Sequence, residues 1–100
     1  MTTPAPQVVH NAAARRFETT VEGQHARADY QLDDGVMRMV HTGVPRALEG
    51  RGIAAALVRA ALEHARAQGL RVEPVCPYVA SYMRKHPGTL DLLAPGIVLR

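Results

Sequence analysis

A long run of helical periodicity between two glycine-containing turns is the feature that most constrains the fold of this chain. Apolar side chains recur at every fourth residue within positions 51–68, from Ile53 through Leu57 to Ala65. This spacing gives a helix one broad apolar stripe, which must pack against another layer. Gly69 follows the last turn, where glycine can adopt the left-handed conformation that closes a helix. The pattern therefore predicts a helix over residues 51–68 that covers a sheet.

Alternating apolar and polar side chains before this helix are typical of half-buried β-strands. Strands are expected over residues 8–10, 16–21, 26–32 and 36–44. The last of these carries apolar side chains on both faces, which is typical of a strand covered on both sides. We expect His41 on the same face of that strand as Met37 and Met39.

The residues after the long helix predict a short strand over 71–76, a second helix from Pro77 to His86, and a last strand over Ile97 to Leu99. A strand, a helix and a strand in succession form a right-handed crossover with parallel strands. Pro74 cannot donate to a strand ladder, so the second parallel strand must separate from its neighbour there or lie at an edge. The chain is thus predicted to have an α+β fold, α/β three-layer-like, with a mostly antiparallel mixed sheet, a β-α-β crossover and two main helices.

Composition narrows the possible functions. With 100 residues we expect one domain over residues 8–100, after a disordered N-terminus of residues 1–7. The net charge of +3 favours an anionic ligand, but the arginines are dispersed and only 4% of residues are aromatic, which does not favour nucleic-acid binding. Cys76 is the only cysteine, so no internal disulfide forms, and a cytoplasmic location is expected. No secretory leader, membrane span or metal site is expected.

The loop before the long helix has the features of an anion site. Gly50 and Gly52 directly precede the first helical turn, whose N–H groups lack intrahelical partners and lie at the positive end of the helix dipole. Two glycines would let a phosphate approach these donors. An ordinary loop that leads into a helix uses the same residues, so the pattern favours phosphate binding without requiring it.

Several short motifs, each common by itself, follow one another in a specific order from Val9 to about Leu93. They are Arg16-Phe17-Glu18, Ala28-Asp29-Tyr30, His41-Thr42-Gly43-Val44-Pro45, Leu48-Glu49-Gly50-Arg51-Gly52-Ile53-Ala54, Ala65-Arg66-Ala67-Gln68-Gly69-Leu70 and Pro74-Val75-Cys76-Pro77-Tyr78-Val79, with Tyr82 and His86-Pro87. This ordered set resembles the minimal single-domain branch of the GNAT superfamily of N-acetyltransferases.

The resemblance implies acetyl-CoA as the donor and an amine of a small molecule, peptide or protein as the acceptor. The residues that it implies for cofactor binding are Thr42, Gly43, Val44, Glu49, Gly50, Arg51, Gly52, Ile53, Ala54, Tyr82, Arg84 and His86. Glu49 departs from the family pattern, which has Gln or Arg at this place, because a carboxylate cannot donate a hydrogen bond to phosphate. This departure leaves a second function open, a CoA-binding or acyl-CoA-binding module without significant turnover.

Two mechanisms fit the implied reaction. In one, the amine attacks acetyl-CoA directly, and Tyr78 is a candidate for the acid that protonates the leaving sulfur. In the other, Cys76 first accepts the acetyl group, with His41 as the base that activates the thiol. Each residue also has an ordinary interpretation: a buried apolar thiol, a strand histidine with a structural hydrogen bond, and a tyrosine that packs on a helix.

Overall fold

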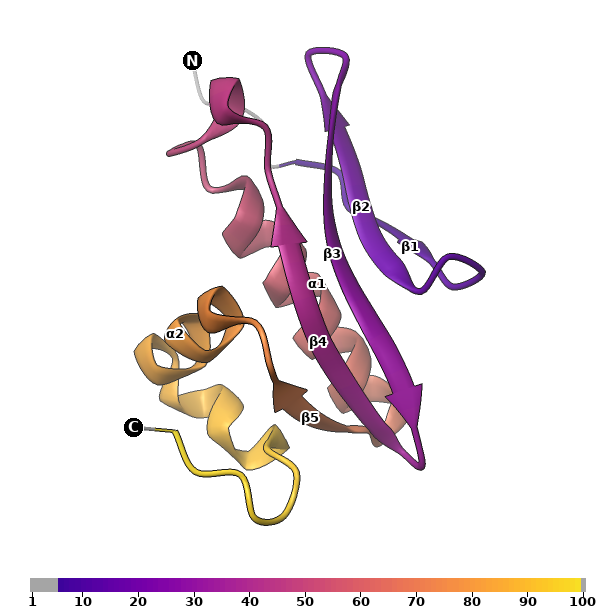
Figure 1. Ribbon diagram of the computed structural model, residues 1–100, viewed down its shortest axis with the longest axis vertical. Helices are drawn as coiled ribbons and strands as arrows, with labels where there is room; N and C mark the ends of the chain where they lie inside the picture. Colours follow the sequence, from indigo (N-terminus) through magenta and orange to yellow (C-terminus); the bar gives the residue numbers. More distant parts are fainter. Residues whose placement is uncertain (1–5, 100) are drawn as a thin grey trace.

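Five strands form one mixed sheet in the order β1-β2-β3-β4-β5 (Figure 1). The computed structural model describes residues 6–99. The strands are β1 (Val9–Asn11), β2 (Arg16–Val21), β3 (Gln24–Asp33), β4 (Val36–Gly43) and β5 (Arg71–Pro74). Neighbouring strands are antiparallel except for β4 and β5, which are parallel because a crossover helix joins them. The predicted α+β fold with a mostly antiparallel mixed sheet is confirmed.

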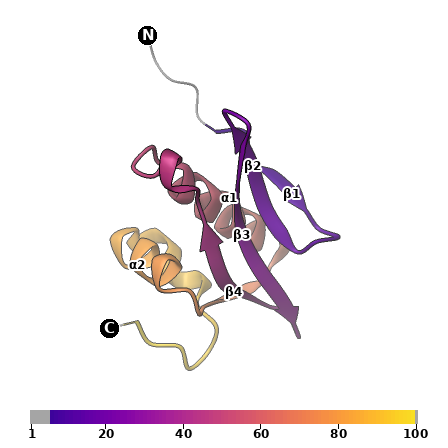
Figure 2. The same ribbon diagram turned by 45° about the horizontal axis from the view of Figure 1, so that its top comes forward.

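Two α-helices pack on this sheet, and α2 lies beside α1 next to β4 and β5 (Figures 1 and 2). The helices are α1 (Ile53–Gln68) and α2 (Pro77–Lys85), with the 3₁₀ segments η1 (Arg46–Leu48) and η2 (Pro87–Leu92). Gly69 ends α1 with a φ of 69°, and the Leu70 N–H donates to the Ala65 carbonyl at 2.8 Å. The predicted left-handed closure of α1 is therefore confirmed.

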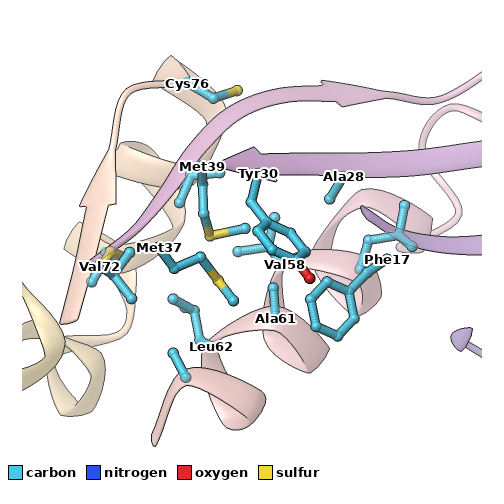
Figure 3. Close-up of a cluster of buried hydrophobic side chains, with 14 of the residues drawn as sticks. Phe17, Ala28, Tyr30, Met37, Met39, Val58, Ala61, Leu62, Val72 and Cys76 are labelled. Carbon is cyan, nitrogen blue, oxygen red and sulfur yellow. The ribbon is translucent and has the colours of Figure 1, made fainter. Parts of the chain in front are cut away.

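One apolar core lies between the helices and the inner face of the sheet (Figure 3). Leu57 and Val58 of α1 are completely buried, and Met37 and Met39 of β4 point toward this helix. Met83 of α2 joins the same core. Each such side chain contributes about 1.5–3 kcal/mol through burial, so the core holds α1 against β2, β3 and β4.

A β-bulge turns His41 away from this core. Asp29 pairs with His41 and the next residue, Tyr30, pairs with Met39, so Val40 is an extra residue on β4. A bulge reverses the alternation of side chains beyond it. His41 therefore lies on the outer face of the sheet, and the prediction that it shares the face of the two buried methionines is wrong.

The outer face of the sheet carries ion pairs. The guanidinium of Arg38 lies 2.9 Å from the Glu73 carboxylate, and that of Arg27 lies 3.4 Å from Asp29. The outward side chains of β4 are half-buried or exposed, whereas its inward methionines are buried. The sequence predicts that both faces of β4 are buried, but only the inner face is fully buried.

The segment after α2 differs from the predicted strand over Ile97 to Leu99. Leu93 instead makes a single parallel bridge with Val72 of β5, and the Ala94 N–H donates to the Val72 carbonyl at 2.9 Å. Gly96 then turns the chain with a φ of 86°, so the ladder cannot continue. The predicted strand is therefore wrong.

The predicted disordered N-terminus falls mainly on residues 1–5, which lie outside the described residues. Within the structure, the Gln7 carbonyl accepts a hydrogen bond from the Thr19 hydroxyl at 2.8 Å. Between residues 6 and 99, no helix is both long and apolar enough to cross a membrane.

An aromatic cluster joins the edge strand β1 to α1. The His10 ring stacks on Phe17 with centroids 4.2 Å apart, and its Nε2 lies 2.6 Å from the Tyr30 hydroxyl oxygen. The His64 ring lies 4.3 Å from His10. Burial, and then repulsion by a charged His64, lower the pKa of His10 below its ordinary value of 6.5. The folded chain therefore favours a neutral His10.

This cluster predicts a loss of stability in mild acid. Because the pKa of His10 is lower in the folded chain, the unfolded chain takes up the proton first as pH falls. The His10 contribution is present above about pH 6.5 and is lost as the pH falls through the folded value. Urea unfolding measured between pH 7 and pH 5 checks this expectation.

The variant His10→Gln should lose this component of the pH dependence, because it keeps a polar partner for Tyr30 but cannot titrate. Hydrogen bonds lower the pKa values of the Glu18 and Asp91 carboxylates, and this contribution to the pH dependence is the same in the parent and the variant, so it cancels in the comparison. An equal decline in the variant and the parent chain would contradict the assignment.

Candidate functional site

Two adjoining cavities lie over the N-terminus of α1. One, of about 460 Å³, lies between the end of β4, the following loop and the first turn of α1. The other, of about 450 Å³, lies between α1 and α2. Gly52, Ala55 and Tyr78 border both cavities, which therefore form one continuous groove, here called the α1 groove.

The loop that leads into α1 exposes backbone donors to this groove. Gly50 and Gly52 have φ values of 79° and 78°, a left-handed conformation that a residue with a Cβ rarely adopts. Among residues 6–99, apart from the chain neighbours of each glycine, no heavy atom lies within 4 Å of the Cβ position of either residue, so the described side chains do not crowd these two positions. Gly52 caps α1 without a side-chain hydrogen bond, and no acidic residue occupies the first turn. The first-turn N–H groups are thus available to an anion.

A gap opens between β4 and β5 beside the groove. The two strands pair only as far as Met39 and Pro74, and the Cys76 N–H then donates to the Met39 carbonyl at 2.8 Å. Beyond this point β4 continues to Gly43 while the chain after β5 turns into α2. The prediction for Pro74 is separation from the neighbouring strand or an edge position, and the structure shows both: β5 is the edge strand, and its pairing with β4 ends at Pro74.

Cys76 lies at this gap and close to Thr42. The Cys76 Sγ is 3.7 Å from the Thr42 Oγ1, and the cysteine is only 8% exposed. Thr42 lines the α1 groove, but His41 points to the outer face of the sheet. The structure thus brings Cys76 together with Thr42 and does not place His41 beside the thiol.

Tyr78 stands where the two cavities meet. Burial raises the pKa of its phenol above the ordinary value of 10.0, and a negative charge on Tyr82 would raise the pKa further. The side chain is still 40% exposed, so its hydroxyl group is within reach of a ligand. Tyr78 stays protonated at neutral pH and can act as a proton donor.

A stacked aromatic pair lines the second cavity. The rings of Tyr82 and His86 lie 3.9 Å apart at an angle of 17°, and the His86 Nδ1 is 2.7 Å from the Tyr82 carbonyl oxygen. Lys85 and Arg59 add positive charge to the walls of this cavity. Such a surface suits a ligand with a planar ring and a negative group.

Most of the residues predicted for cofactor binding line this groove. They are Thr42, Val44, Glu49, Gly50, Gly52, Ile53, Ala54, Tyr82 and His86. Gly43, Arg51 and Arg84 lie outside its lining, and the Arg51 guanidinium pairs with Glu22 in the turn between β2 and β3.

Arg59 and Lys85 are among several basic residues that the sequence offers for a cofactor phosphate, but the sequence favours Arg51 and Arg84, which do not line the groove. A helical signal for Lys85 was available, because Tyr78, Tyr82 and Lys85 follow the i, i+4, i+7 spacing of one helix face. Arg84 lies one residue off this face and does not line the groove. Within residues 6–99, no group of three His, Cys, Asp or Glu side chains is placed to hold a metal ion.

Comparisons with known proteins agree with this architecture. The family model for GCN5-related N-acetyl-transferases matches residues 16–92. Protein NATD1 of Gallus gallus is 36% identical over 84 residues, which cover 81% of this chain and 76% of that protein. Protein NATD1 of Homo sapiens is 34% identical over 84 residues, which cover 81% of this chain and 74% of that protein.

A solved structure with the same fold is the NMR solution structure of a GCN5-like protein from Staphylococcus aureus. It matches with a TM-score of 0.71 and 22% sequence identity, and the match covers 92% of this chain and 91% of that one. At this level of identity, the match supports the fold and not a particular substrate.

Proposed function

Because this chain belongs to the family of GCN5-related N-acetyltransferases, we propose that it transfers an acetyl group from acetyl-CoA to an amine. The observation that carries the proposal is the open N-terminus of α1 beside the gap between β4 and β5. The open backbone donors suit a diphosphate, and the gap leaves the end of β4 unpaired by β5. A long ligand with a negatively charged middle fits these two features.

We assign three parts of the α1 groove to three parts of the cofactor. The N–H groups of the turn from Gly52 to Ala55 would bind the diphosphate, in keeping with the positive end of the helix dipole. The end of β4 at Thr42 to Val44 would hydrogen-bond the pantetheine arm. The cavity with the Tyr82 and His86 rings would receive the adenosine end, with Lys85 near its phosphate.

Direct attack by the amine is the mechanism that the arrangement supports best. The amine nitrogen attacks the thioester carbonyl, the carbon–sulfur bond breaks with its electrons on sulfur, and the nitrogen loses a proton to a base. Tyr78 would donate a proton to the sulfur, and its position at the border of both cavities supports this role. We assign the base to His41, which lies on the outer face of the part of β4 that β5 does not pair.

Glu49 does not close the groove. Its side chain is exposed, and it borders the cavity without capping the first turn of α1. A CoA-binding module without turnover would have the same groove as an acetyltransferase. The two functions are therefore distinguished by whether CoA is released when an acceptor amine is added.

We expect the chain to release CoA when an amine acceptor is present, and we expect this activity to require an open α1 groove. Ala55 borders both cavities, and Ala55→Leu should fill the groove while preserving helix propensity. The expected rise in the KM for acetyl-CoA is roughly tenfold or more, equal to about 1.4 kcal/mol. Steady-state thiol release with a panel of amines measures both the activity and the effect.

Ala67→Leu is the matched control, because Ala67 is exposed near the other end of α1. An unchanged KM in Ala55→Leu would contradict the position of the cofactor. Saturable binding of acetyl-CoA without release of CoA to any amine would contradict the enzyme and favour the binding module.

Direct attack further predicts that Cys76 is dispensable for the chemistry. Its Sγ contacts Thr42, whereas His41 lies on the opposite face of β4, so Cys76→Ala should keep kcat within about threefold of the parent chain, a change of less than about 1 kcal/mol. Intact-mass measurement of the parent chain after incubation with acetyl-CoA should show no stable adduct on Cys76. An acetyl adduct that maps to Cys76, together with loss of turnover in the variant, would favour the covalent route.

A further inference from the structure

The backbone conformation of Gly43 does not require a glycine. Gly43 ends β4, and its φ does not lie in the left-handed region, so any residue could adopt this conformation. Glycine in a strand loses more conformational entropy on folding and offers no side chain for packing. A glycine at such a position often marks a close approach by another group.

The group that approaches Gly43 is the imidazole of His41. A Cβ placed on Gly43 would lie 3.1 Å from the His41 Nε2 and 3.8 Å from its Cδ2. At the seven other glycines, an added Cβ would meet nothing within 4 Å in the described part of the chain, apart from the neighbouring residues in sequence. The space left by the missing side chain is thus filled by one imidazole, and the atom closest to it is a ring nitrogen that can carry a proton.

The β-bulge and Gly43 together determine where this ring lies. The bulge puts His41 on the outer face, and Gly43, two residues later, lies on the same face toward the end of β4. The intervening Thr42 points to the opposite side and lines the α1 groove. The ring therefore extends along the outer face of β4 toward Gly43, in the part of the strand that β5 does not pair.

The surroundings leave the ring accessible. His41 is exposed, and the charged side chains across from it on β3 are Asp29, opposite His41, and Arg27, opposite Gly43. These two form an ion pair with a distance of 3.4 Å, so their charges largely compensate each other. An amine that enters from the outer face can thus reach the imidazole without passing through the cofactor groove.

We propose that Gly43 is a positioning residue: by lacking a side chain it holds the His41 imidazole at the gap, where Nε2 accepts the proton of the attacking amine. This inference rests on the proposed acetyl transfer. In the step, the nitrogen–carbon bond forms, the carbon–sulfur bond breaks, and the amine proton moves to His41 while the sulfur gains a proton from Tyr78. Gly43 itself contacts neither substrate through a side chain.

The test is Gly43→Ala, with Gly88→Ala as the matched control. Neither glycine has a positive φ, but an added Cβ at Gly88 meets nothing within 4 Å. The alanine at position 43 must move the ring by a few tenths of an ångström or rotate it. We expect kcat to fall about tenfold, because misplacement of a base by about 1 Å costs up to 10²-fold, while the KM for acetyl-CoA stays unchanged. The control variant should retain its kcat.

A double-mutant cycle separates this role from a structural one. His41→Ala should lower kcat by about 10²-fold, the usual contribution of a general base. Adding Gly43→Ala to His41→Ala should cause no further loss, since the added methyl group then has no ring to displace. Thermal melts of all variants verify folding, and the double variant should recover any stability that Gly43→Ala loses. The NMR signals of the His41 imidazole should shift in Gly43→Ala and not in Gly88→Ala.

Two results would overturn the inference while leaving acetyl transfer in place. One is an unchanged kcat in Gly43→Ala; if the KM for acetyl-CoA rises at the same time, Gly43 is a cofactor-binding residue only. The other is independent losses that multiply in the double variant. Failure of the parent chain to acetylate any amine is a different result, because it would overturn the proposed function itself.

Discussion

Burial of the apolar stripe of α1 against the sheet is the interaction on which the rest of the structure depends. Leu57, Val58 and Ala61 are completely buried, so α1 cannot move away from β4 without exposing the core. This packing holds the first turn of α1 at the end of β4. The backbone donors of that turn are therefore fixed in direction before any ligand binds, and a preorganised site of this kind loses little entropy on binding.

The second constraint is the interruption of the ladder between β4 and β5. Pro74 ends the pairing, and α2 begins three residues later, so the end of β4 remains without a parallel partner. The bulge at Val40 then determines which side chains lie on each face of this strand. Thr42 lines the α1 groove on the inner face, and His41 lies on the outer face. The proposed reaction joins a donor from one face to an amine from the other.

The elements that could be predicted from sequence are those set by local patterns. The stripe of α1, its closure at Gly69 and the alternation in β2 each depend on neighbours within a few residues. The resemblance to N-acetyltransferases, drawn from the order of several motifs, is confirmed by the family model and by the shared fold. The paired glycines before α1 also indicated the open turn that the structure contains.

The features that could not be predicted depend on pairing between distant residues. A bulge is invisible in a strand with apolar residues on both faces, because either alternation fits the pattern, and this led to the wrong face for His41. The bridge between Leu93 and Val72 is a single residue pair, so no periodic pattern in the sequence predicts it. Lys85 could have been found from the helical spacing with Tyr82, whereas the approach of His41 to Gly43 could not.

The claim that everything else depends on is that the open turn of α1 binds the diphosphate of CoA. A ¹⁵N NMR titration of the parent chain with CoA tests it most directly, since amides that donate to phosphate shift strongly. The account predicts saturable shifts that are largest at Gly50 to Ala55, with smaller ones at Thr42 to Val44. Shifts confined to β1 and β2, or no saturable shift at the turn, would contradict it.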